Sequence, residues 1–211
     1  MDKRITVALI DGGLPDTGEF NIVSRVGFRL DGNKVIRTSK PKVDNDHGVT
    51  VARCIKKVYS NVDFIDINIL DENMESCGMI LLEALRYCRE VNAQVINMSL
   101  GTTRLRYYFK MKRIINSLLR EEKIIVAAEN NGTKRSYPAN INGVTGIKGV
   151  GTLDMNRVKY RGSFYYTSAV FEDKGGNSIA CGYMTGHICR ALNKYGNKKI
   201  NELLKRGKFN E

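Results

Sequence analysis

The sequence predicts an α/β fold in which helices cover both faces of a mostly parallel sheet. Between residues 4 and 128, short apolar runs of strand length alternate with segments whose apolar residues recur at helical spacing. Most of the short runs are continuously apolar, as is typical of strands that are buried on both faces. An alternation of strands and helices implies right-handed crossover connections, and therefore a parallel sheet with helices on both sides.

The first half of the chain supplies four of the expected elements. Residues 5–10 are expected to form a buried strand, because ITVALI is a continuous, partly β-branched run that ends at Asp11, Gly12 and Gly13. By the same criteria the next elements are a weaker strand over 22–30 with a hairpin turn at 31–33, a helix over 47–59 and a strand over 62–69.

The second half continues the alternation and then departs from it. The expected order is a helix marked by Leu81, Leu82, Leu85, Cys88 and Val91, a strand over 94–98, a basic amphipathic helix over 107–119 and a strand over 124–128. After Gly132 come Gly-rich loops, β-like pieces at 150–153 and 158–166, and a helix over 178–195. This last third is expected to contribute residues to the same functional site as the preceding strands, or to cover that site.

The composition limits the class of protein. A chain of 211 residues with 42% hydrophobic residues predicts one globular domain over residues 1–211, since chains of this length bury roughly 70% of their unfolded surface. No apolar run reaches the roughly 18 residues that a membrane span needs. The N-terminal apolar run meets Asp11 and two glycines too early for a signal peptide. We therefore expect a cytoplasmic protein without a membrane partner.

The residues that commonly bind metals show no ligand pattern. The five cysteines are odd in number and form no C-x-x-C pair, which favours reduced thiols over disulfides or a zinc site. The oxygen-rich segments 44–46 and 71–73 lack the spacing and the glycine of a calcium loop, so a turn and a helix cap are expected there. No metal and no cofactor are expected.

Positive charge is in excess and concentrated. The chain has 34 Lys and Arg against 22 Asp and Glu, a formal net charge of +12, with concentrations at 104–123 and 194–208. Such a charge favours anionic partners by long-range steering. On the solvent face of a helix that flanks the sheet, the first cluster would lie far from a cleft and would act by steering or by docking an acidic partner or precursor segment.

Polar residues follow three of the expected strands, at the edge where ligands bind in open α/β sheets. Asp11 ends the first strand, Ser99 follows the strand over 94–98, and Asn130 follows the strand over 124–128. His47 and Ser178 are expected to begin helices. Those two side chains are of the types that nucleophilic catalysis pairs as base and nucleophile.

Only two histidines could serve as the base for Ser178. His187 lies nine residues further along the same expected helix, about 13.5 Å away along its axis, and cannot reach it. His47 can reach it if the fold places its helix beside Ser178, and Asp11 would then orient the imidazole. A histidine at a helix start that stood alone would more often be a cap or a solvated side chain.

His47 does not stand alone, because five segments resemble motifs of the subtilisin-like serine proteases. They are VALIDGG at 7–13, which resembles the family's D-[ST]-G, HGVTVA at 47–52, VINMSLG at 95–101, VAAENNG at 126–132 and GNSIA at 176–180. Each match is weak by itself, whereas the order Asp, His, Asn, Ser in five matching contexts is specific. The resemblance runs from about Ile5 to Leu192, and its start near the N-terminus favours a compact form without a propeptide.

The resemblance implies a three-layer α/β/α sandwich, subtilisin-like, and hydrolysis of peptide bonds through an acyl-enzyme. It implies catalytic roles for Asp11, His47 and Ser178 and an oxyanion role for Asn130. The strand end formed by Ser99, Leu100 and Gly101 would pair with an extended substrate. The implied partner is a peptide or protein substrate, with or without acidic segments, and the small size favours the maturation of a specific precursor peptide.

Two alternatives remain open. The chain could be a catalytically idle member of the fold that binds peptides, although a binding module needs none of the four catalytic residue types. It could instead be a basic nucleic-acid-binding protein. This hypothesis is less favoured because the sequence has no zinc finger, helix-turn-helix or RNP-type aromatic signature.

Departures from the family motifs affect specificity more than chemistry. Gly12 replaces a Ser or Thr, Val49 replaces a Thr, Gly182 stands where the family has Pro, and Thr102 and Thr103 replace a Gly-Pro pocket wall. Glu129 replaces the Gly before the oxyanion Asn, in the pocket for the side chain on the acyl side of the cut bond. A carboxylate there predicts cleavage after Lys or Arg, unless Glu129 turns away to pair with Lys134 or Arg135.

Overall fold

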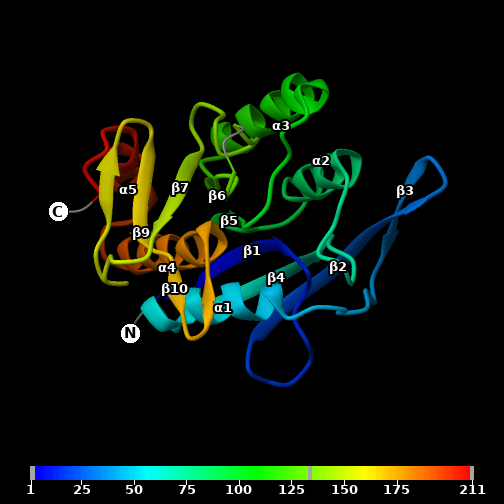
Figure 1. Cartoon of the computed structure of the whole chain (residues 1–211), viewed down its shortest axis with the longest axis horizontal. Coiled ribbons are helices and arrows are strands. Elements are labelled where there is room, and N and C mark those ends of the chain that lie inside the picture. The colour runs from blue at the N-terminus through cyan, green and yellow to red at the C-terminus, as the bar shows by residue number, and fades with distance from the viewer. Residues whose placement is uncertain (1–2, 133–134, 210–211) are drawn as a thin grey trace.

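A nine-stranded sheet forms the centre of the molecule, as the computed structural model of residues 3–132 and 135–209 shows (Figure 1). From one edge to the other, its strands are β3 (Lys34–Thr38), β2 (Asn21–Asp31), β4 (Val62–Asn68), β1 (Ile5–Asp11), β5 (Val95–Met98), β6 (Ile124–Ala128), β7 (Thr145–Val150), β9 (Phe164–Ser168) and β8 (Lys159–Arg161). The seven strands from β2 to β9 run parallel, and the edge strands β3 and β8 pair antiparallel. The mostly parallel sheet is confirmed.

Helices cover both faces of this sheet (Figure 1). One face carries α1 (His47–Val58), α4 (Asn177–Tyr195) and α5 (Asn197–Lys205), and the other carries α2 (Gly78–Tyr87), the short 3₁₀ helix η1 (Leu105–Tyr107) and α3 (Tyr108–Arg120). Strand periodicity explains the two layers, because Val7 and Leu9 of β1 pack toward α1 and α4 while Ala8 and Ile10 pack toward α2 and α3. The three-layer α/β/α fold is confirmed.

The structure corrects one expected strand. Residues 151–153 form a turn, and β7 lies earlier in the chain, over a stretch that its glycines made resemble a loop. A Cβ at Gly146 would lie 2.7 Å from the Ala139 carbonyl oxygen and 2.8 Å from the ring of Phe164. The glycine is therefore required by close packing against this strand rather than by a flexible connection.

All five cysteines are free thiols. Cys54, Cys88, Cys181 and Cys189 are buried, and burial raises the pKa of the first three to about 12, whereas Cys77 is partly exposed. These buried thiols remain protonated and unreactive at neutral pH. None of the helices in the described residues is long and apolar enough to cross a membrane.

Candidate active site

Two parallel helices bring the N-terminal turns of α1 and α4 together. In order along both helices, Gly182 lies against Val51 and Gly186 lies against Ile55, where a Cβ on either glycine would come within 2.9 Å and 2.6 Å of the facing carbonyl oxygens. One turn further toward both N-termini, this register places Ser178 opposite His47. The absence of a side chain on the two glycines permits this close approach of the helices.

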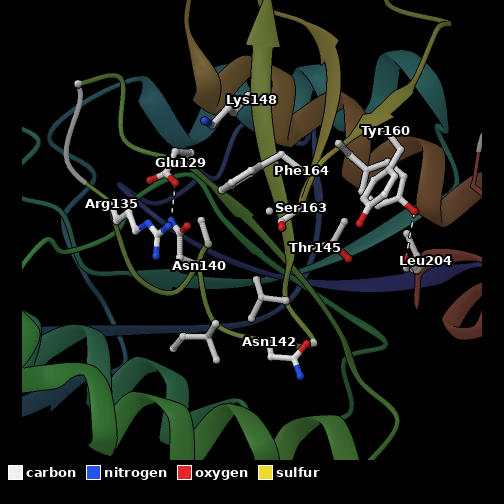
Figure 2. A pocket seen from close by; sticks show the side chains of 17 residues that line it. Glu129, Arg135, Asn140, Asn142, Thr145, Lys148, Tyr160, Ser163, Phe164 and Leu204 are labelled. Carbon is white, nitrogen blue, oxygen red and sulfur yellow. Dashed lines mark hydrogen bonds between the residues drawn. The ribbon is translucent and has the colours of Figure 1, made fainter. Parts of the chain in front are cut away.

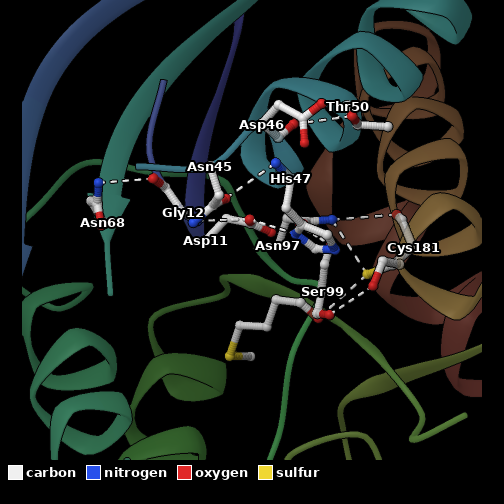
Figure 3. A network of polar contacts seen from close by, with 12 residues as sticks. Asp11, Gly12, Asn45, Asp46, His47, Thr50, Asn68, Asn97, Ser99 and Cys181 are labelled. Atoms are coloured by element: carbon white, nitrogen blue, oxygen red, sulfur yellow. Dashed lines mark hydrogen bonds and ion pairs between the residues drawn. The ribbon is translucent and has the colours of Figure 1, made fainter. Parts of the chain in front are cut away.

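Asp11 orients His47. Asp11 is the last residue of β1 and points to the same face as Val7 and Leu9, where α1 begins. Its Oδ1 accepts a hydrogen bond of 2.6 Å from Nδ1 of His47 and one of 2.7 Å from the Gly12 backbone N–H (Figure 3). Asp11 is completely buried, while the His47 side chain remains 24% exposed toward solvent.

The carboxylate also changes the basicity of the imidazole. Burial of the ring lowers the pKa of His47, but the charge of Asp11 and the hydrogen bond to it outweigh that effect, and the pKa is raised above its ordinary value. The pair thereby favours the protonated imidazole that forms when a histidine accepts the proton of a nucleophile.

Asn45 occupies the space that a side chain at position 12 would fill. A Cβ on Gly12 would lie 2.1 Å from the Asn45 Oδ1. This oxygen accepts a hydrogen bond of 3.1 Å from the His47 backbone N–H (Figure 3). Nδ2 of Asn45 donates to the Asp71 carbonyl oxygen at 2.8 Å. Asn45 therefore fixes the first turn of α1, and its role is not visible in the sequence because the bond to Asp71 and the contact with Gly12 join segments that are distant in the chain.

Ser178 begins α4 beside the end of β5. Its hydroxyl donates a hydrogen bond of 2.9 Å to the Ser99 carbonyl oxygen. In the described part of the chain it makes no hydrogen bond to His47, so general-base catalysis requires the hydroxyl to rotate toward the imidazole. Such bonds are often absent from structures without substrate and form only in the bound complex.

Asparagine side chains hold the surrounding segments in place. Nδ2 of Asn97 in β5 donates to Thr185 Oγ1 in α4 at 2.7 Å. Asn177 accepts a hydrogen bond of 2.7 Å from the Gly149 backbone N–H and donates to the carbonyl oxygens of Glu129 and Asn130 at 2.9 and 3.3 Å. These bonds tie the middle of α4 to β5 and its first residue to the ends of β6 and β7.

A pocket of about 320 Å³ brings most of the predicted site residues together. Its lining includes Ser178, Asn130, Glu129, Ser99, Leu100 and Gly101. Asn130 is exposed at this pocket. Its Oδ1 accepts a hydrogen bond of 3.2 Å from the Gly132 backbone N–H, and this bond does not involve the amide nitrogen Nδ2. Asp11 and His47 lie outside this lining and approach Ser178 from the α1 side.

Comparison with known proteins identifies the family. The sequence matches the profile of the subtilase family, Peptidase_S8, over residues 2–169, which is most of the chain and includes the Asp11, His47 and Asn130 segments but not Ser178. The chain belongs to the subtilase family. It is therefore a serine peptidase by family, and no curated protein gives a significant match.

Solved structures confirm the subtilisin-like fold. This subtilase superposes on a cold-adapted subtilisin-like serine proteinase with a TM-score of 0.73 and 18% identity, over 96% of this chain and 81% of that chain. A lanthipeptide protease gives a TM-score of 0.72 with 16% identity over 96% and 80% of the two chains. A mutant of the protease domain of PatA gives 0.68 with 16% identity over 95% and 84%.

In this subtilase Glu129 is a fixed anion on the pocket wall. The residue is 8% exposed, and one of its carboxylate oxygens accepts hydrogen bonds from the backbone N–H groups of Asn130 and Ser136 at 2.9 Å and from the Ser136 hydroxyl at 2.6 Å. The other accepts one from Asn140 (Figure 2). Burial raises the pKa of Glu129, but these donors together lower it below its usual value.

Glu129 does not turn away to pair with Arg135. Arg135 makes no ion pair with it in the described residues, and Lys134 lies outside them. Glu129 separates the Ser178 pocket from a neighbouring cavity of about 740 Å³, which Asn140 and Thr145 also line (Figure 2). Glu129 therefore lines both the Ser178 pocket and this cavity, and its lowered pKa keeps the carboxylate ionised at neutral pH.

Proposed function

We propose that the chain is a serine endopeptidase that acts through an Asp11–His47–Ser178 triad and an acyl-enzyme. The observation that carries the proposal is the 2.6 Å bond from His47 to a fully buried Asp11, at the start of a helix that runs parallel to the helix of Ser178. A module that only binds peptides has no need for an imidazole oriented in this way.

The proposed reaction follows from these positions. Ser178 Oγ attacks the scissile carbonyl carbon as its proton passes to Nε2 of His47, which then donates that proton to the departing amine. The Ser178 backbone N–H at the start of α4 and the Asn130 side-chain amide stabilise the oxyanion. Water, deprotonated by His47, then hydrolyses the ester and restores the serine.

The substrate is proposed to be an extended peptide, and a specific precursor in particular. Ser99, Leu100 and Gly101 continue β5 beyond the sheet, so their backbone groups can pair with an added strand. Such backbone pairing does not depend on the substrate's side chains, so the pockets that receive those side chains determine which peptides are cleaved. One of the structural neighbours is described as a lanthipeptide protease, and the five free thiols support action in a reducing, cytoplasmic compartment.

Labelling with a serine-directed fluorophosphonate tests the proposal. We expect one modified residue, Ser178, when the labelled protein is digested and mapped. Ser99→Ala is the matched control, since it removes the neighbouring hydroxyl in the same pocket and should still be labelled, while Ser178→Ala should not. A folded wild-type protein that resists labelling and cleaves no peptide would instead be the idle peptide-binding module.

Glu129 is proposed to direct cleavage after Lys or Arg. Its ionised carboxylate lines the pocket beside Ser178. The carboxylate would attract the cationic side chain of a substrate Lys or Arg, and the attraction would be strongest when the bound substrate excludes water from the pocket. We expect Glu129→Gln, which keeps the side-chain shape, to lower kcat/KM for Lys and Arg substrates by about tenfold or more and to leave Leu substrates unchanged.

A peptide library that varies the residue before the cut bond measures this preference. Glu121→Gln, an equal charge change at a surface ion pair, serves as the control. A wild-type enzyme that prefers Leu or Phe, with a profile that Glu129→Gln does not alter, would show that the carboxylate only holds its own loop.

A further inference from the structure

The segment after the substrate-binding strand carries basic charge that the fold leaves uncompensated. The chain has no Asp or Glu between Glu90 and Glu121, while η1 and α3 expose a row of basic side chains. In the described residues, none of these forms an ion pair. We define the η1–α3 surface by Arg104, Leu105, Arg106, Phe109, Lys110 and Arg113.

The same surface carries the two most exposed large hydrophobic side chains of the described residues. Leu105 is 67% and Phe109 is 79% exposed, more than any other large hydrophobic side chain in the described ranges. Leu105 lies in η1 and Phe109 in the first turn of α3, and Arg113 follows Phe109 on the same face of α3 one turn later. Arg106 is held against Tyr107 by a hydrogen bond of 2.9 Å and by contact with the ring. Apolar and cationic groups therefore alternate over the exposed face.

The surface is continuous with the active-site cleft, and the expectation that the basic cluster lies far from the cleft is wrong at this end. Arg104 lines the pocket that contains Ser178. It also lines a smaller pocket of about 140 Å³ between α2 and η1, together with Cys77, Leu100 and Gly101. A strand paired with Leu100 and Gly101 thus reaches Arg104 and the start of η1 before it leaves the protein. Figure 1 shows α2 and α3 together on the face of the sheet opposite α1 and α4.

The geometry points to an exosite on the η1–α3 surface that binds an acidic segment of the peptide substrate, outside the residues that enter the cleft. Carboxylates of that segment pair with Arg106, Lys110 and Arg113, and its large apolar side chains pack on Leu105 and Phe109. The two exposed apolar groups favour such a peptide over duplex nucleic acid, whose bases are stacked within the helix and whose phosphates pair with cations alone. This inference rests on the proposed peptidase function and names the substrate class of that site.

Two cleavable peptides with a common core test the exosite. One is the short neutral core alone, and the other extends it on the acyl side with Asp and Glu interspersed with Leu and Phe. The triple variant Arg106→Gln, Lys110→Gln, Arg113→Gln is expected to raise KM for the extended peptide about tenfold at low salt, with kcat unchanged. The short peptide is expected to be cleaved as by the wild type.

Matched variants separate docking from general steering. Lys198→Gln, Lys199→Gln, Lys208→Gln removes the same charge from exposed positions near the C-terminus and should leave the KM of the extended peptide unchanged. Phe109→Ser, which keeps the net charge, should raise the KM of the extended peptide severalfold. Equal KM values for wild type and the Arg106 triple variant, or an equal rise in the Lys198 triple variant, would overturn the exosite.

Binding measurements keep the exosite separate from the peptidase proposal. Fluorescence anisotropy of the labelled extended peptide with the Ser178→Ala protein measures affinity without turnover. Failure of the wild type to cleave the short core would refute the peptidase, while loss of this affinity in the Arg106 triple variant would still support the exosite. Tight binding of duplex DNA to the surface, lost in the triple variant while peptide affinity is retained, would assign the surface to nucleic acid instead.

Discussion

Replacing Ser178 or His47 with alanine is expected to lower the turnover of a cleavable peptide by about 10⁶ while the protein remains folded. The magnitude is that known for subtilisin, a member of the same family, where removal of the serine or the histidine costs as much as removal of the whole triad. The two residues act as one unit, so the double variant should be no worse than either single variant. Asn130→Ala should cost less, roughly 10² to 10³, the loss known for the oxyanion asparagine of subtilisin.

Single-turnover and steady-state assays with a fluorogenic peptide measure these losses, and thermal unfolding confirms that each variant is folded. His187→Gln is the control for the loss of an imidazole, because His187 is buried in α4 and its Nε2 bonds to the Met155 carbonyl oxygen at 2.7 Å. It should retain activity. Wild-type cleavage by Ser178→Ala would remove Ser178 from the mechanism.

Asp11→Asn is expected to lower kcat/KM by about 10⁴, the order found in other Asp–His–Ser proteases, and to shift the pH profile. His47 must be neutral to act as a base, so activity falls as the pH drops through the pKa of His47. Asp11 raises that pKa. Without its charge the pKa decreases, and the acidic limb of the profile should therefore move to lower pH.

A profile of kcat/KM against pH measures both effects. Asp46→Asn is the control, because Asp46 precedes His47 and pairs with Lys174 but is exposed. Its charge also raises the pKa of His47, so a small shift in the same direction is expected without the large loss. An Asp11→Asn variant with an unchanged acidic limb would show that another group controls the profile.

Most elements of the fold were predictable because local signals agreed. In β1, β4 and α1 the periodicity, the residue types and the turn residues all indicate the same structure, and each begins and ends close to its predicted residues. In β7 they conflict, since Gly146 packs against Ala139 and Phe164, a contact that no local pattern reveals. The basic run near the C-terminus forms α5, whereas its sequence pattern indicates only a concentration of charge.

The site was predictable in its residue types and less so in its supports. The motif contexts pointed to Asp11 and His47, which the structure joins by a hydrogen bond. They gave no sign of the roles of Asn45 or Asn177, because each of these asparagines bonds to segments that are distant in the sequence. The inward orientation of Glu129 likewise depends on Ser136 and Asn140, which the fold alone brings within reach.

The glycine contacts between α1 and α4 affect how this protein can change over generations. Gly182 and Gly186 do not line the Ser178 pocket, yet a methyl group on either would collide with the backbone of α1 and separate the helices that carry His47 and Ser178. Substitutions on this seam are thus coupled to residues of α1 that must shrink or shift in compensation. The active site consequently constrains the sequence along two helices rather than at four positions, and drift on one helix is tolerated only together with drift on the other.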